Sequence, residues 1–231
     1  MKTKILNLAM VFCLVVGSLL YTSPASAEAI DSYIWNDPFE PSIYDYVYLG
    51  VMRVDGVEWP ADAVCHWNFG DGTTADVCYI NGIKRFNSDG DYTVTVDATF
   101  TDGNTAFASK TIAVRTHDVA ITKFTVPQSA KVGQTRQITV NVRNTRYPER
   151  VQVELYKIDD SNLVWVGTLV QDVPVRPASR TTVFTFNYTF TNEDARVGKA
   201  TFRAMAFILE NDGDDWPADN DVTALSTRVN R

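Results

Sequence analysis

Trp67-Asn68-Phe69-Gly70-Asp71-Gly72, followed twenty residues later by Tyr92-Thr93-Val94-Thr95-Val96, is the part of the chain that decides the fold. An aromatic segment ends in a turn where two glycines can adopt positive φ at little cost, and the aspartate between them can hydrogen-bond back to turn amides. The second segment alternates apolar and polar residues with a period of two, which indicates a half-buried β-strand. The two segments therefore predict strands on either side of a glycine turn.

The same alternation recurs along the rest of the chain, and no segment after residue 27 shows a 3.6-residue apolar period over three turns. Alternating runs cover residues 92–100, 138–143, 151–156 and 184–190. Turn sequences separate them: Asp55-Gly56, Asp71-Gly72, Asp89-Gly90, Asp102-Gly103 and Asn211-Asp212-Gly213. This pattern predicts an all-β chain.

Residues 28–116 form the first predicted domain. The Trp67–Gly72 turn followed by the strand from Tyr92 resembles the polycystic-kidney-disease (PKD) domain. That resemblance implies an immunoglobulin-like β-sandwich on an extracellular protein. PKD domains usually carry a histidine and an aromatic residue before the last strand, whereas Lys84 and Phe86 stand in the comparable stretch here. The departure affects the expected loop geometry and leaves the expected fold unchanged.

Residues 117–231 form the second predicted domain. A first strand at 117–121 leads to Val126-Pro127, a turn at Gly133 and a core strand at 137–144. This order resembles the CARDB module (cell-adhesion-related domain found in bacteria), which is also an immunoglobulin-like sandwich. The fold class is thus predicted to be two tandem immunoglobulin-like β-sandwiches. Because the junction at 115–117 has no glycine, serine or proline run, we expect a semi-rigid connection.

Residues 1–27 read as a cleaved signal peptide. Lys2 and Lys4 precede an apolar run from Ile5 to Leu20, and Ala25-Ser26-Ala27 is a small-x-small cleavage site. An uncleaved anchor is the alternative, but the run is near the short limit for spanning a bilayer. The mature chain is therefore expected to be secreted or at the cell surface, with the periplasm left open, and without insertion into a membrane.

The mature chain is acidic. With 19 Lys and Arg against 28 Asp and Glu, its formal net charge is −9, and no basic cluster interrupts it. An acidic chain of this kind is a poor partner for nucleic acid. The expected partner is a protein or a polysaccharide at the cell surface.

Two cysteines remain after the signal peptide, Cys65 and Cys78, one on each side of the glycine turn. In an oxidising compartment a pair on adjoining strands predicts a disulfide. It would close a loop of about 14 residues and stabilise the fold by roughly 3 kcal/mol. A metal or redox pair is the alternative, but the spacing does not fit C-x-x-C.

No catalytic motif is present. The two histidines, His66 and His117, are expected on a strand surface and at the domain junction. The sequence contains no nucleophile elbow, metalloprotease helix or paired nucleophilic cysteine. We therefore expect a non-catalytic protein.

Tryptophans give the candidate ligand contacts. Trp67 and Phe69 are expected in the core, since immunoglobulin-like sandwiches bury a tryptophan on this strand. A short internal repeat is the more unusual feature: the segments Asp55–Asp62 and Asp212–Asp219 both begin with Asp-Gly and end in Trp-Pro-Ala-Asp. Its tryptophans, Trp59 and Trp216, either contact a ligand or fold back to plug the end of each sandwich, and we favour the plug.

Calcium is the one cofactor for which the sequence contains candidate ligands. Five carboxylates lie within ten residues: Asp212, Asp214, Asp215, Asp219 and Asp221. They are dense enough to supply oxygen ligands, but the bidentate glutamate of an EF-hand loop is missing. A solvated acidic turn is the interpretation we favour, and no cofactor is otherwise expected.

The sequence as a whole predicts a secreted adhesion or scaffold protein that contacts proteins or polysaccharides. One alternative is a carbohydrate-binding accessory module of an extracellular hydrolase system. Another is a subunit of an extracellular filament, which predicts concentration-dependent assembly. The sequence sets neither the oligomeric state nor the ligand.

Overall fold

The computed structural model describes residues 29–231 except 58, 60–62, 161 and 211–212. The predicted signal peptide lies outside the described residues. Strands dominate the chain, and the described part contains one α-helix and one short 3₁₀ helix. No helix among these residues is long and apolar enough to cross a membrane. The prediction of an all-β fold is confirmed.

The first sandwich is built from seven strands. They are β1 (Ala29–Asp37), β2 (Val47–Arg53), β3 (Val64–Asn68), β4 (Thr74–Ala75), β5 (Tyr79–Lys84), β6 (Gly90–Thr99) and β7 (Thr105–Val114). The spatial order is β4-β3-β6-β7-β1-β2-β5.

Strand β1 belongs to both layers of this sandwich. Its first residues, Ala29–Asp31, pair in parallel with β7 of one layer. From Ser32 onward it pairs antiparallel with β2, which in turn pairs with β5. The three-stranded layer β1-β2-β5 therefore has one face on the core and one face open.

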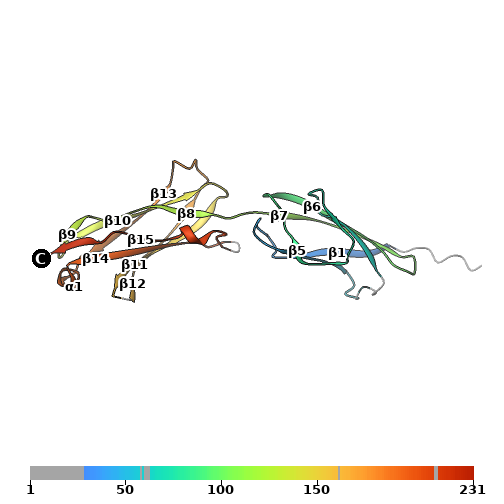
Figure 1. The fold of residues 1–231 in the computed structure, drawn as a ribbon, viewed down its shortest axis with the longest axis horizontal. Coiled ribbons are helices and arrows are strands. Elements are labelled where there is room, and N and C mark those ends of the chain that lie inside the picture. The colour runs from blue at the N-terminus through green and yellow to red at the C-terminus, as the bar shows by residue number, and fades with distance from the viewer. Residues whose placement is uncertain (1–28, 58, 60–62, 161, 211–212) are drawn as a thin grey trace, which may run out of the picture.

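The second sandwich holds the remaining strands in two layers, as Figure 1 shows. One layer has the order β13-β10-β8 and the other β12-β11-β14-β16-β9, with β15 paired to β14. Their bounds are β8 (Val119–Thr125), β9 (Ser129–Lys131), β10 (Thr135–Asn144), β11 (Glu149–Asp159), β12 (Asn162–Val173), β13 (Thr182–Thr189), β14 (Lys199–Ile208), β15 (Asp221–Thr223) and β16 (Thr227–Asn230). Helix α1 (Asn192–Val197) begins at a capping box formed by Thr191 and Asp194.

Each sandwich has its own hydrophobic cluster. Along β6, Val94, Val96 and Ala98 are at most 2% exposed, as the two-residue period predicts. In the second sandwich Phe190 and Phe202 pack edge-on, with ring centroids 6.3 Å apart. Since no described core residue belongs to both clusters, we propose that they mark two domains that meet near Thr116.

Asp89, at the end of the first sandwich, joins the two halves. Its carboxylate accepts hydrogen bonds from the Thr116 hydroxyl at 2.6 Å, the Tyr147 hydroxyl at 3.1 Å and the Arg146 guanidinium at 3.3 Å. The segment between β7 and β8 is also tied back, because the Arg115 amide donates to the Pro41 carbonyl. These bonds connect side chains of both sandwiches, while the semi-rigid connection stays a prediction.

Candidate functional site: an exposed aromatic face on the first sandwich

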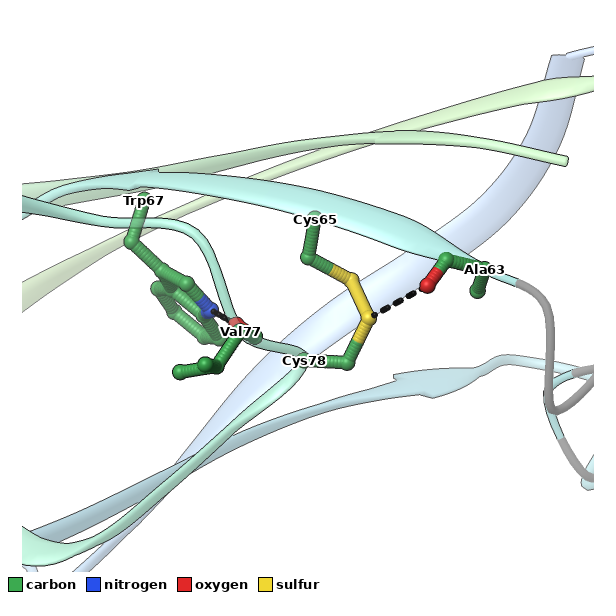
Figure 2. The surroundings of a disulfide bond; sticks show 5 residues. All are labelled: Ala63, Cys65, Trp67, Val77 and Cys78. Carbon is green, nitrogen blue, oxygen red and sulfur yellow. Dashed lines mark hydrogen bonds between the residues drawn. A yellow bond between two sulfur atoms is a disulfide. The ribbon is translucent and has the colours of Figure 1, made fainter.

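The core side of the first sandwich contains the residues that the sequence singled out first. Cys65 on β3 forms a disulfide with Cys78, with 5.0 Å between the Cα atoms, as predicted. Figure 2 shows Trp67 two residues along the same strand, with its indole N–H donating to the Val77 carbonyl at 2.6 Å. Trp67 is fully buried and stacks on Phe69 at 6.2 Å. The expected core role of both aromatic residues is confirmed.

The glycine turn is held by a buried ion pair. Asp71 accepts from its own turn, at the Thr73 amide, and from the Lys84 ammonium. That ammonium lies 4.6 Å from the centre of the Phe69 ring. Burial pushes the pKa of Asp71 up, but hydrogen bonds from Lys84 and Thr73 outweigh it, so the pKa is lowered overall. Gly70 adopts φ 74°, and a Cβ there would lie 2.6 Å from the Thr93 carbonyl oxygen.

The two tryptophans of the short repeat have different surroundings. Trp59 packs against the first core, with its ring 5.1 Å from Phe100, so the plug interpretation holds for it. Trp216 is 56% exposed and lies 6.3 Å from Tyr44 of the other sandwich, so the plug interpretation is wrong for it. The reason is that its loop lies at the junction rather than over a core. A ligand contact by either tryptophan stays a prediction.

The acidic segment near the C-terminus uses its carboxylates within the protein. Asp214 accepts from the amides of Val119 and Trp216, and Asp215 accepts from the amide of His117. Asp221 forms an ion pair with Arg203.

Asp219 is the remaining described member of this segment. Burial raises its pKa, and the nearby Asp214 carboxylate adds to that rise. Among the described residues no group of three or more candidate ligands is arranged to hold a metal ion. Asp212 lies outside them, so calcium binding stays a prediction with no geometry behind it.

Both histidines have structural partners. His66 is exposed on β3, and its Nδ1 lies 2.5 Å from the Asp76 carboxylate. His117 is buried at the junction, with Nδ1 2.7 Å from Glu149. That hydrogen bond raises the pKa of His117 against the opposing effect of burial. Each imidazole thus has a carboxylate partner that holds it in place.

The feature that sequence reasoning missed is the open face of the β1-β2-β5 layer. We call the outward side chains of Tyr33, Trp35, Tyr48, Met52 and Tyr79 the aromatic face. On β1 the core-facing residue is Ile34, so its two neighbours point outward, and on β2 the core-facing residues are Leu49 and Val51. Four of the five members are between 42% and 53% exposed. A contiguous apolar surface of this kind is uncommon on a protein that acts alone.

Strand register brings these side chains together. Tyr33 on β1 lies opposite Met52 on β2, and Trp35 lies opposite Gly50. Gly50 lies opposite Tyr79 on β5, so Trp35, Gly50 and Tyr79 form one row across three strands. Tyr33 and Met52 are in contact, with the Tyr33 hydroxyl 3.5 Å from the Met52 sulfur, and the Trp35 ring fills the gap that Gly50 leaves in the row.

Two glycines determine how the rings lie. A Cβ at Gly50 would stand 2.3 Å from Nε1 of Trp35, and one at Gly82 would stand 2.6 Å from the Tyr48 ring. Each ring thus occupies the space of a missing side chain and lies across the backbone of the neighbouring strand. A larger residue at either glycine would lift the ring away from the sheet.

The exposed charges on the strands of the aromatic face are acidic, while two arginines at its edges already have partners: Arg53 pairs with Asp55, and Arg85 donates to the Ile43 carbonyl. The exposed residues of β1, β2 and β5 include two carboxylates, Asp31 and Asp37, and no cation. Asn81 adds an exposed amide on β5. The side chain of Lys84 is only 8% exposed and pairs with Asp71 on the core side. The aromatic face therefore offers apolar rings, hydrogen-bonding groups and negative charge.

No protein-family model matches the chain, and no curated protein sequence matches it. Three N-terminal domains of the Highly Immunogenic Outer Capsid protein of bacteriophage RB49 match with a TM-score of 0.51 at 17% identity, over 87% of this chain and 70% of that one. A CARDB domain of the PF1109 protein of Pyrococcus furiosus, in complex with di-metal ions, matches with a TM-score of 0.39 at 20% identity. The match covers 49% of this chain and 89% of that one.

Fibronectin(III)-like modules of CbhA from Clostridium thermocellum match at a TM-score of 0.38 and 12% identity, over 85% of this chain and 94% of that one. Identities this low show the fold alone, and TM-scores under 0.5 carry no argument. The fold of this chain is thus that of tandem immunoglobulin-like β-sandwiches, while assignment to the PKD and CARDB families stays a prediction.

Proposed function

We propose that this chain is an extracellular, non-catalytic binding protein that contacts a polysaccharide or a protein at a cell surface. The observation that carries the proposal is the aromatic face: five large side chains side by side on an open sheet layer. Burying such a surface against a partner is favourable by about 25 cal/mol per Å² of apolar area. Tyrosine and tryptophan are also enriched among residues that dominate binding energy.

Two further observations support an extracellular location and a non-catalytic role. The Cys65–Cys78 disulfide suits an oxidising compartment outside the cytoplasm. His66 and His117 each pair with a carboxylate, which accounts for both imidazoles without a catalytic role. The mechanism is therefore passive. The first sandwich presents its aromatic face, and the bonds of Asp89 hold the second sandwich beside it.

A binding panel tests this function. The mature chain, residues 28–231, would be incubated with immobilised cellulose, chitin, peptidoglycan, collagen and fibronectin, and the bound fraction would be measured. We expect at least one surface to retain the protein and the double variant Trp35→Ala/Tyr79→Ala to lose retention. Retention by none of the five surfaces, or equal retention of the double variant, would contradict the proposal.

The matched control for this panel is Trp165→Ala. Trp165 lies on β12 of the second sandwich and is 61% exposed, so the variant removes an exposed indole outside the aromatic face. It should be retained like the unaltered protein. Thermal unfolding of all variants would check that each remains folded.

A further inference from the structure

We infer that the ligand of the aromatic face is a neutral polysaccharide chain whose sugar rings stack on Trp35, Tyr48 and Tyr79. The inference rests on the proposed function and narrows its ligand class. A pyranose ring presents an apolar C–H surface on its faces and hydroxyls around its rim. Aromatic rings carry negative charge on their faces, to which polarised C–H groups are attracted.

The position of the rings favours a planar ligand over a protein. Hot-spot aromatic residues of protein interfaces fill pockets on the partner surface. Here Trp35 and Tyr48 lie across Gly50 and Gly82 instead of projecting from the sheet. Such a surface has little to insert into a partner's pocket, but it offers broad contact to a flat ring.

The dimensions of the face favour a chain over a single sugar. Tyr33 and Trp35 lie two residues apart on β1, which is roughly 7 Å along the strand. Across the strands, the row of Trp35, Gly50 and Tyr79 spans two strand spacings, roughly 10 Å. The face is open to solvent, so a polymer can cross it without an end entering a pocket.

The negative charge of the layer and of the whole mature chain favours a neutral polysaccharide over an anionic one. The exposed residues of the layer include Asp31 and Asp37, and the cations beside it already have partners, Arg53 with Asp55 and Arg85 with the Ile43 carbonyl. The mature chain as a whole has a formal net charge of −9. An anionic polysaccharide would meet like charge, which costs association energy and slows encounter. The carboxylates can instead accept hydrogen bonds from sugar hydroxyls at the rim of the face, and the Asn81 amide can both donate to them and accept from them.

Affinity electrophoresis of the mature chain tests this inference. The gels would contain hydroxyethyl cellulose, laminarin or xyloglucan as neutral probes, and alginate as an anionic probe. We expect at least one neutral polymer to retard the protein and alginate to leave it unretarded. Trp35→Ala should weaken the apparent affinity at least tenfold, while Trp35→Phe, which keeps a ring, should lose less.

Control variants separate a binding effect from unfolding. Trp165→Ala, outside the aromatic face, should migrate like the unaltered protein, and the unfolding midpoint of Trp35→Ala should stay near that of the parent. Retardation by alginate alone, or equal retardation of Trp35→Ala, would overturn the inference. If no polysaccharide retards the protein while collagen or fibronectin still retains it through the same residues, the neutral-polysaccharide inference fails and the proposed binding function stands.

Discussion

Trp67 and Trp35 lie on strands of the same sandwich and have opposite environments. Trp67 on β3 is completely buried, stacks on Phe69 and gives its N–H to the Val77 carbonyl. Trp35 on β1 lies on the open side of the layer, over Gly50. The difference shows that one residue type serves the fold on one face of a strand and is available to a ligand on the other.

The neighbours, rather than the tryptophans, produce this difference. Trp67 finds a hydrogen-bond acceptor for its N–H, without which burial of the indole would be costly. Trp35 finds a glycine on the next strand, which leaves room for its ring against the sheet. Substitutions on the two faces should therefore have separable effects on stability and on binding.

The largest effect is expected from Trp67→Ala. Removing a fully buried indole leaves a cavity, and large-to-small changes of this kind cost about 3–5 kcal/mol. Urea unfolding followed by circular dichroism would measure the loss. Trp35→Ala is the matched variant and should change the free energy of unfolding far less. Equal losses for the two variants would show that Trp35 is a core residue and would remove the contrast.

The next largest effect is expected from breaking the disulfide. The bridge joins residues 13 positions apart, and closing a loop of that length stabilises by about 3 kcal/mol. The double variant Cys65→Ala/Cys78→Ala should lose this amount in chemical unfolding. Cys78 directly precedes Tyr79 of the aromatic face, so loss of the bridge should also loosen the start of β5, and binding should weaken. Unchanged binding would show that the bridge does not help to position Tyr79.

A smaller, pH-dependent effect is expected at Asp71. Its pKa in the folded protein is lowered, so its carboxylate stabilises the fold above its ordinary pKa, and that stabilisation is lost as pH falls through the lowered value. Asp71→Asn should cost about 1–3 kcal/mol at pH 6, because it leaves the Lys84 ammonium without its charged partner. The gap between variant and parent should narrow toward pH 2.

Asp55→Asn is the surface counterpart of this change. Asp55 pairs with Arg53 at 2.5 Å, but half of its side chain is exposed. Exposed pairs contribute little, so its effect on unfolding at pH 6 should be much smaller than that of Asp71→Asn. Equal effects would mean that the Lys84 pair is no more buried than the surface pair.

The smallest effect on stability is expected from Gly50→Ala. A Cβ at this position would collide with the Trp35 indole at 2.3 Å, so the ring must move off the sheet. The ring is on the open side and has solvent to move into, so the cost should be about 1 kcal/mol. Polysaccharide binding should nevertheless weaken several-fold. Unchanged binding would show that the position of the Trp35 ring does not matter.

The sequence predicted the fold well because strand alternation and turn residues are local. The all-β class follows from spacing within a few residues, whereas the core role of Trp67 follows from the resemblance to immunoglobulin-like sandwiches. The disulfide follows from two cysteines 13 residues apart, one on each side of the glycine turn. The aromatic face could not be found this way, because it depends on which strands pair. Tyr33 and Trp35 do flank Ile34 with a period of two, which was the available signal.

What the sequence could not supply was register. Only the pairing of β1 with β2 places Trp35 over Gly50, and only the pairing of β2 with β5 adds Tyr79 to the row. The sequence instead pointed to Trp59 and Trp216 as candidate ligand contacts, because the eight-residue repeat that contains them is visible without a structure. Their environments differ because tertiary position, not the local motif, decides exposure.

We propose that the aromatic face, rather than the junction, holds the ligand. Acrylamide quenching of tryptophan fluorescence, with and without hydroxyethyl cellulose, laminarin or xyloglucan, tests it most directly in the parent and in two variants, Trp35→Phe and Trp216→Phe. We expect a neutral polysaccharide to protect part of the signal in the parent and in Trp216→Phe, and none in Trp35→Phe. Protection that persists in Trp35→Phe and disappears in Trp216→Phe would contradict it and place the ligand at the junction.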